Sequence, residues 1–339
     1  MLATALVVAS LAGACGDGGS SAGGDHPSVV VTTSVLGDVV RDLVGEGTSV
    51  AVLVPAGADP HELQPSARQV AEMREADLLV VNGGGLEAGL DDAMATAVDE
   101  GVPVFEAIDH VPTLPAATGA RDGHGDGRHP VDPHFFTDPA RMARAAEALA
   151  DRLATTVPGL ATDAFRRRAA AVVADLRALD AEVAATLEVV PPERRRLATT
   201  HDLLAYLADR YGFEVLGSVV GSLSEDAGPS ARDIAALAAR VRDAGVPAVF
   251  TDASSSRDLA EALADEAGGL DVVVVHGESL GEPGSGADTY AGMIRTDAER
   301  IAAALAPPGT APAGQRSGRA DRHGRSPGVT SPPRYRSGR

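Results

Sequence analysis

His61 and His201 follow predicted strands and His134 follows a long loop, and the three together suggest a metal site. His61 and His134 each end the tripeptide Asp-Pro-His, and His201 directly follows the predicted strand 195–200. Proline fixes its own backbone φ and restricts the residue before it, so each tripeptide presents its imidazole from a stiff loop. Imidazole binds zinc, copper, nickel and iron, whereas magnesium and calcium prefer oxygen ligands. Three converging imidazoles therefore predict a transition-metal site.

A carboxylate should complete such a site, and the second half of the chain offers two. The predicted strand 271–275 runs into the tripeptide His-Gly-Glu, which makes Glu278 the first candidate. Asp252, at the end of the predicted strand 247–252, is the second, although a carboxylate there more often caps the next helix. His276 would lie beside the ligands or face solvent. Three nitrogen donors and one carboxylate make a closed tetrahedral zinc site.

The same donors also occur in zinc hydrolases, where an open fourth position holds a water molecule. Glu62, next to His61, would then serve as the general base. However, the chain has no HExxH motif, and Glu278 would close the coordination shell. We therefore expect a binding protein rather than an enzyme. An adhesin-like lipoprotein is a third class, in which metal delivery would remain the underlying chemistry.

The elements that must position these residues alternate between short β-rich runs and amphipathic segments, which is typical of parallel sheets covered by helices. The first half has expected strands at 28–33, 48–55, 77–82 and 102–105, with helices at 35–45, 65–76 and 86–98. The second half has expected strands at 195–200, 212–219, 247–252 and 271–275, with helices at 202–211, 229–245 and 256–268. This α/β pattern predicts two Rossmann-like lobes, with ligands at the carboxyl ends of their strands.

One long helix should join the two lobes rigidly. A helical pattern without Gly or Pro runs from about residue 162 to 189, and it would extend roughly 40 Å at 1.5 Å per residue. We expect the lobes at 28–158 and 191–306, the linking helix at 159–190 and the metal site in the interlobe cleft. The tetrapeptide Pro-Ser-Ala-Arg occurs in each half, and its serine should open a helix in a capping box with the residue three positions on.

The N-terminal segment indicates export. An apolar run of about 13 residues precedes Cys15, too short to cross a bilayer but suited to a signal peptide. With Gly13 and Ala14 before the cysteine, the run resembles a bacterial lipobox. We expect residues 1–15 to form the lipoprotein signal with Cys15 lipidated, and residues 16–27 to form a flexible tether. This predicts an extracytoplasmic protein, anchored to the outer face of the cell membrane.

Composition and charge bound the remaining possibilities. At 339 residues and 44% hydrophobic composition, the chain can form two real cores. Its 3% aromatic content and net charge of −19 disfavour nucleic-acid binding. The tail 307–339 carries seven Arg against one Asp and has no hydrophobic periodicity, so we expect it to be disordered.

Three segments resemble the metal-binding, cluster A-I substrate-binding proteins of ABC importers, the zinc and manganese class. They are GADPHELQPSARQVAEMREADLLVVNGGGLE, DPHFFTDP and TTHDLLAYLADRYGFEVLG, and the likeness covers about residues 28 to 305. The resemblance implies two lobes joined by one long helix, and His61, His134 and His201 as ligands. Glu278 stands where the family typically has Asp, and Phe136 where its signature commonly has Trp. Loss of the indole removes a donor but should preserve the packing behind His134.

The resemblance also implies the cargo and the partners. Family members with His, His, Glu and Asp tend to bind manganese, whereas a third His favours zinc. Zn²⁺ is therefore the expected transported ligand, with Mn²⁺ as the alternative. An ABC permease, its ATPase and a metallochaperone are the implied partners of a monomer that contacts the membrane through its lipid anchor. Relatives often carry a mobile histidine-rich or acidic loop near residues 119–132, so we expect His124 and His129 to collect zinc there.

Overall fold

The computed structural model describes residues 28–116, 131–220 and 230–307. The predicted signal segment with Cys15, the tether, the tail from residue 308, and His124 and His129 lie outside the described residues. Within the described part of the chain, no helix combines the length and the apolar character needed to cross a membrane.

The first lobe contains a parallel sheet with strand order β2-β1-β3-β4. Its strands are β1 (Val29–Val31), β2 (Val50–Val52), β3 (Leu78–Val81) and β4 (Val104–Glu106). Its helices are α1 (Ser34–Val44), α2 (Ala67–Glu75), α3 (Asp91–Asp99) and α4 (Pro139–Thr156), with short turns η1 (Ala88–Leu90), η2 (Ala107–His110) and η3 (Phe135–Thr137). The residues of β1 and β3 are buried throughout, as expected of parallel strands covered on both faces.

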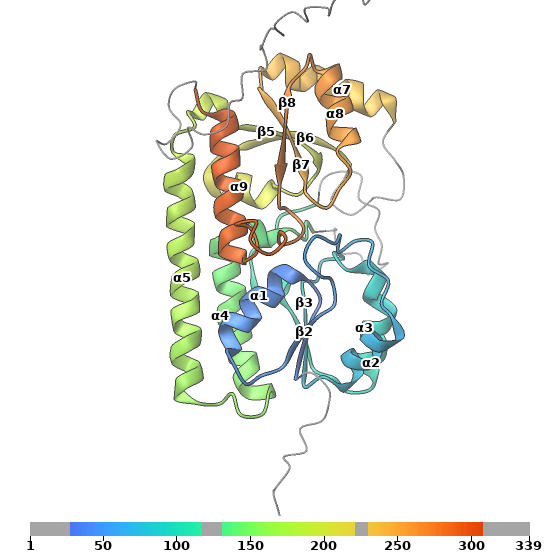
Figure 1. The fold of residues 1–339 in the computed structure, drawn as a ribbon, viewed down its shortest axis with the longest axis vertical. Helices are drawn as coiled ribbons and strands as arrows, with labels where there is room; N and C mark the ends of the chain where they lie inside the picture. The colour runs from blue at the N-terminus through green and yellow to red at the C-terminus, as the bar shows by residue number, and fades with distance from the viewer. Residues whose placement is uncertain (1–27, 117–130, 221–229, 308–339) are drawn as a thin grey trace, which may run out of the picture.

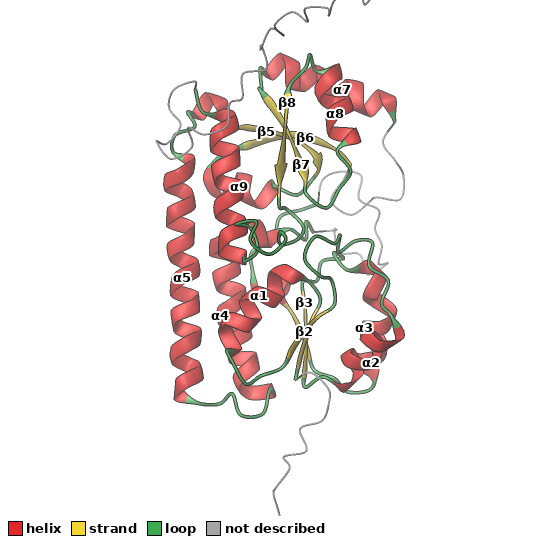
Figure 2. Cartoon of the chain, in the orientation of Figure 1, coloured by secondary structure: helices red, strands yellow, loops and turns green. Residues whose placement is uncertain are grey.

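The second lobe repeats this plan with strand order β6-β5-β7-β8. Its strands are β5 (Arg196–His201), β6 (Glu214–Val220), β7 (Ala248–Asp252) and β8 (Asp271–Val275). Its helices are α6 (Ala205–Tyr211), α7 (Ala231–Ala244), α8 (Asp258–Glu266) and α9 (Tyr290–Leu305), and η4 (Pro192–Arg194) precedes the first strand. Figure 2 shows both sheets with helices against them, so the predicted α/β architecture of two parallel sheets is confirmed.

The long helix is α5 (Asp163–Leu187), which runs beside both lobes in Figure 1. Thr162 begins it by accepting a hydrogen bond from the backbone N–H of Phe165. Its buried side chains recur every three or four residues, from Phe165 to Leu187, and form one apolar stripe. That stripe packs against α4, α9 and α1. One continuous hydrophobic cluster therefore includes residues of both lobes and of α5, which opposes independent motion of the lobes.

Both predicted capping boxes are present. The side chain of Ser66 accepts from the backbone of Gln69, and that of Ser230 accepts from the backbone of Asp233. In each case the side chain of the later residue accepts from the backbone N–H of the serine. The same local rule thus starts α2 and α7, one in each lobe.

Candidate metal centre

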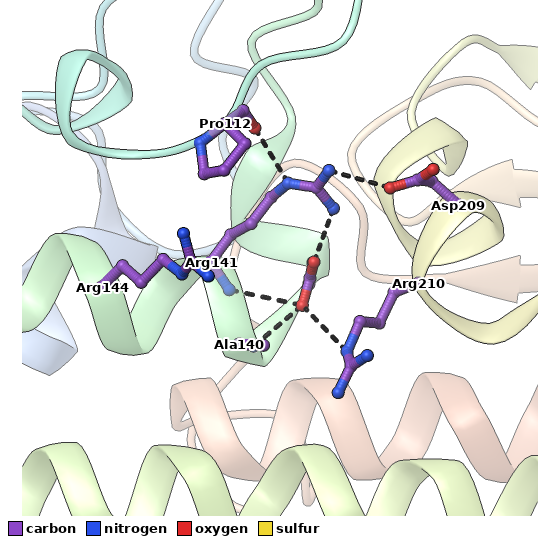
Figure 3. A pocket seen from close by; sticks show the side chains of 7 residues that line it. Pro112, Ala140, Arg141, Arg144, Asp209 and Arg210 are labelled. Carbon is purple, nitrogen blue, oxygen red and sulfur yellow. Dashed lines mark hydrogen bonds and ion pairs between the residues drawn. The ribbon is translucent and has the colours of Figure 1, made fainter.

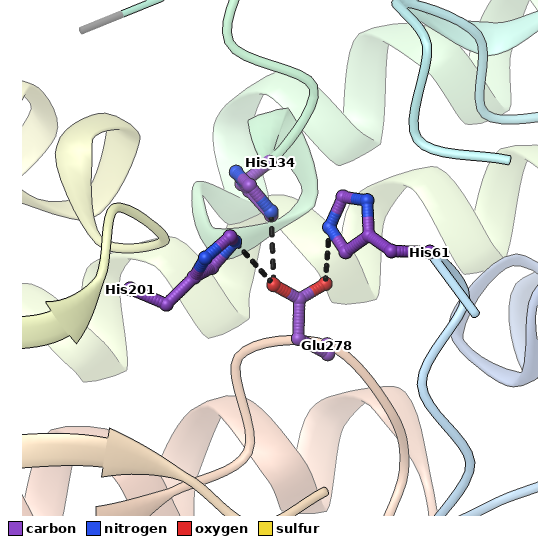
Figure 4. Close-up of side chains that lie close together, drawn as sticks. All are labelled: His61, His134, His201 and Glu278. Atoms are coloured by element: carbon purple, nitrogen blue, oxygen red, sulfur yellow. Dashed lines mark ion pairs between the residues drawn. The ribbon is translucent and has the colours of Figure 1, made fainter. Parts of the chain in front are cut away.

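The structure brings His61, His134, His201 and Glu278 together between the lobes (Figure 4). His61 lies on the loop after β2, and His134 immediately precedes η3. His201 is the last residue of β5, and Glu278 lies on the loop after β8. One ligand atom from each residue lies within 4.8 Å of the others. His61, His201 and Glu278 therefore lie at strand ends or on loops that follow strands, where open parallel sheets bind ligands, and His134 joins them from the segment before η3.

The nitrogen and oxygen atoms of the cluster face one another at short range. The Oε1 atom of Glu278 lies 3.0 Å from Nε2 of His134 and 3.2 Å from Nε2 of His201. The other carboxylate oxygen, Oε2, lies 3.6 Å from Nε2 of His61. The four side chains are between 0% and 11% exposed, and His61 is the most exposed. Nitrogen and oxygen donors from both lobes thus converge on one buried position.

Several of these buried atoms lack a hydrogen bond of good geometry within the described chain. They are Nε2 of His61, Nε2 of His134 and both carboxylate oxygens of Glu278. The nitrogen and oxygen atoms lie within ion-pair distance of one another, at 3.0 Å for His134 and 3.6 Å for His61. A buried polar atom left in this way costs about 1–3 kcal/mol, so such atoms rarely gather without a ligand. Nitrogen lone pairs and a carboxylate fit a cation at this place.

Both Asp-Pro-His tripeptides fold into the same local turn. Oδ1 of Asp59 accepts the backbone N–H of His61 at 2.8 Å, and Oδ1 of Asp132 accepts that of His134 at 2.9 Å. Asp132 has a second role, because its Oδ1 also lies 2.7 Å from Nδ1 of His134. A carboxylate at Nδ1 places the imidazole proton there and leaves the Nε2 lone pair for the cluster.

Asp252, the second candidate for the fourth ligand, does not join the four donors. Its Oδ2 instead accepts the backbone N–H groups of Gly277 and Glu278, and its Oδ1 accepts from Ser254. Burial and the charge of Glu278 raise the pKa of Asp252 to about 6. This carboxylate therefore supports the backbone of the loop that carries Glu278.

Two other candidates also lie outside the cluster. Glu62 is exposed, although it is next to His61 in the chain. His276 is half-buried and donates its backbone N–H to Asp297 at 2.9 Å. Phe136, by contrast, packs against His134 as expected, with the ring centroids 6.0 Å apart and the rings edge to face.

The loops that carry His61 and Glu278 are bonded to each other across the lobes. The backbone N–H of Gly57 donates to Oγ of Ser279, with an N to O distance of 2.9 Å, and also to the carbonyl oxygen of Leu280, with an N to O distance of 3.0 Å. Oγ of Ser34, at the start of α1, accepts the N–H of Leu280 at 3.2 Å. Sequence reasoning missed these contacts, because serine hydroxyls carry no signal of a distant partner.

The charges of the cluster shift its pKa values strongly. Burial lowers the pKa of His134, but the charges of Glu278 and Asp132 outweigh it and hold the pKa well above its ordinary value. Burial raises the pKa of Glu278, but His134 and His61 outweigh it and hold the pKa well below its ordinary value. The pKa of His61 is also raised, since Glu278 outweighs the effect of burial. A metal ion must therefore displace protons that Glu278 helps to retain.

The chain matches known proteins along nearly its whole described length. Residues 29–304 match the family model described as "Zinc-uptake complex component A periplasmic". The chain is 31% identical over 294 residues to the zinc-binding protein TroA of Treponema pallidum, covering 83% of this chain and 89% of that protein. It is 28% identical over 303 residues to the manganese-binding lipoprotein MntA of Halalkalibacterium halodurans, covering 88% and 96%.

The fold agrees with these matches. The solved structure of the periplasmic zinc-binding protein TroA from Treponema pallidum is similar, with a TM-score of 0.73 at 28% identity, covering 83% of this chain and all of that one. Two lobes, each with one parallel sheet, and a long helix beside both are the architecture of a bilobal substrate-binding protein. The chain belongs to the ZnuA family, the metal-binding substrate-binding proteins of ABC importers. It is therefore a binding protein, and the hydrolase alternative is rejected.

Proposed function

We propose that the chain captures Zn²⁺ with His61, His134, His201 and Glu278 and delivers it to the permease of an ABC importer. The observation that carries this proposal is the convergence of three imidazoles and one carboxylate within 4.8 Å. Substrate-binding proteins of this class work with a permease and its ATPase. The cargo ion is thus a substrate, held by deprotonated ligands and released at the membrane.

Zinc is favoured over manganese by the third imidazole. Relatives are named for either metal, so family membership leaves the choice to the donors. Manganese prefers sites rich in oxygen and stands at the weak end of the affinity order for divalent metals. His201 supplies nitrogen, and the four donors suit the tetrahedral coordination of zinc.

Zinc bound at one ion per chain is the expected result of metal analysis on protein purified without chelators. In a competition titration, zinc should displace manganese with an affinity at least about 100-fold higher, since three of the four donors are imidazoles. Manganese should displace no measurable zinc at equal concentration. A preparation that retains no transition metal, or one that prefers manganese, would contradict the choice of zinc.

We also propose that the protein acts outside the cytoplasm, held by lipid on Cys15. The lipobox-like segment before this residue supports the anchor, and the similar MntA protein is named a lipoprotein. Cell fractionation compares the natural chain with a Cys15→Ser variant. The natural chain should remain with the membrane and the variant should leave it, whereas equal membrane retention would argue against lipidation.

A further inference from the structure

The backbone on both sides of His134 is held by two tyrosine hydroxyls. Tyr206, on α6, donates to the carbonyl oxygen of Asp132 at 2.7 Å. Tyr290, the first residue of α9, donates to the carbonyl oxygen of Phe136 at 2.8 Å. The two acceptors lie two residues before and two residues after His134. Both donors belong to helices that follow α5, whereas the acceptors precede it.

These hydrogen bonds are shielded from water. The exposed fraction is 0% for Tyr206 and 2% for Tyr290. Burial raises the pKa of Tyr206 to about 12 and that of Tyr290 well above its ordinary value, so both hydroxyls keep their protons at neutral pH. Tyr206 has one more bond, because its oxygen accepts the backbone N–H of Leu114 at 3.0 Å. Loss of its hydroxyl would therefore leave two backbone groups without this partner, the buried carbonyl of Asp132 and the partly buried N–H of Leu114.

Charged side chains reinforce the contact between α6 and the segment after His134. Arg141 donates to Asp138 at 2.6 Å and to Asp209 at 2.8 Å. Figure 3 shows its guanidinium directed at Asp209. The guanidinium of Arg141 also lies 4.8 Å over the ring of Tyr206. Arg210 lies 3.9 Å from Asp138. Asp138 is the N-cap of α4 and ends the segment 132–138 that contains His134, so this end of the segment is also joined to α6.

The first lobe holds the same segment at one further point. Nδ2 of Asn82, which follows β3, donates to the carbonyl oxygen of Pro133 at 2.9 Å. Three carbonyls around His134 are thus fixed from three elements, two of them in the second half of the chain. His134 is therefore positioned jointly with His201, which lies on the strand immediately before α6.

We propose that Tyr206 and Tyr290 form a hydroxyl clamp that positions His134 for metal and slows metal release. This inference rests on the proposed function, in which His134 is a ligand. The clamp fixes the loop before the ion arrives, so little ordering remains to be done when it binds. It also couples His134 to α6 and α9. A displacement of these helices on docking to the importer would move the ligand.

The test compares Tyr206→Phe, Tyr290→Phe and the double variant with the natural chain, using zinc and cobalt as probes. Each single variant should raise the zinc dissociation rate and Kd by about 2- to 10-fold, the range for one buried hydrogen bond. Tyr206→Phe should have the larger effect, because it leaves two groups unpaired. The visible absorption of bound Co²⁺ should change as well, since it reports the geometry of the ligands.

Tyr211→Phe is the matched control. Tyr211 is also buried and is the last residue of α6. Its hydroxyl donates to Asp180 on α5 at 3.1 Å, and in the described part of the chain it makes no hydrogen bond to residues 132–136. The Tyr211→Phe variant should have the same zinc dissociation rate and the same cobalt spectrum as the natural chain. Unchanged kinetics and spectrum in the double variant would overturn the clamp, and so would equal effects of Tyr211→Phe. Failure of the proposed function would look different, because the natural chain would then bind zinc no better than a His134→Ala variant.

Discussion

His134→Ala should weaken zinc binding by more than about 100-fold, which exceeds the usual cost of losing an outer partner of a ligand. The substitution removes one of four donors from a fully buried cluster and leaves Asp132 without the ring it contacts. A competition titration against a zinc chelator measures the change. Circular dichroism and thermal unfolding of the metal-free variant should show that the fold remains.

Two further substitutions should give graded losses if the four residues bind one ion. Glu278→Gln keeps the size of the side chain but removes its charge, so it should approach the effect of His134→Ala. Asp132→Ala leaves every donor in place and removes the carboxylate that contacts both Nδ1 and the backbone N–H of His134, so we expect a loss of about 10- to 100-fold. The order of these losses distinguishes a ligand from the residue that orients it.

His110→Ala serves as the control for the loss of an imidazole. His110 is exposed and stacks on Phe105 with a centroid distance of 4.5 Å, outside the cluster. Its removal should leave zinc affinity within experimental error of the natural chain. The proposed site would be contradicted by a His134→Ala variant that binds zinc as tightly as this control.

Much of the fold could be predicted from local sequence patterns. The two Pro-Ser-Ala-Arg segments predict helix starts because a capping box involves residues only three apart. The long helix could be predicted because apolar residues recur along α5 without Gly or Pro. The strands that precede His61 and His201 are equally local features, and strand ends in parallel sheets determine where ligands lie. These features need no knowledge of distant contacts.

The supporting contacts of the site could not be predicted in the same way. Asp252 ends β7 and Glu278 follows β8 in the same sheet, but only the packing of the loop after β8 decides which carboxylate faces the imidazoles. The hydroxyl of Tyr290 bonds to a carbonyl 154 residues earlier in the chain. Tyrosines in such positions look like core residues in the sequence, since their rings are buried in either case.

The increase in Tm caused by zinc should shrink as the pH falls from 8 to 5.5. Zinc binds only neutral imidazoles. Because the pKa values of His61 and His134 are raised, protons compete with zinc for their ring nitrogens already above pH 6.5. At a zinc concentration of 1,000 times Kd, binding stabilises the fold by about 4.1 kcal/mol, and a 100-fold loss of affinity leaves about 1.4 kcal/mol. Thermal unfolding with and without zinc at each pH measures this difference.

The stability of the metal-free protein should increase over part of the fall in pH from 8 to 5.5, whereas the stabilisation by zinc decreases. The raised pKa of His134 gives a contribution that is complete below pH 6.5 and is lost as the pH rises through that pKa. The lowered pKa of Glu278 gives a second contribution to stability. This contribution is present above pH 4.5 and is lost as the pH falls through the lowered pKa of Glu278. The ion pair thus stabilises the metal-free fold most between about pH 4.5 and 6.5, where zinc binds least. His110→Ala, which removes an exposed histidine outside the cluster, should keep the natural pH dependence. If zinc raises Tm by the same amount at pH 8 and at pH 5.5, zinc binding releases no proton from the imidazoles, and this prediction is wrong.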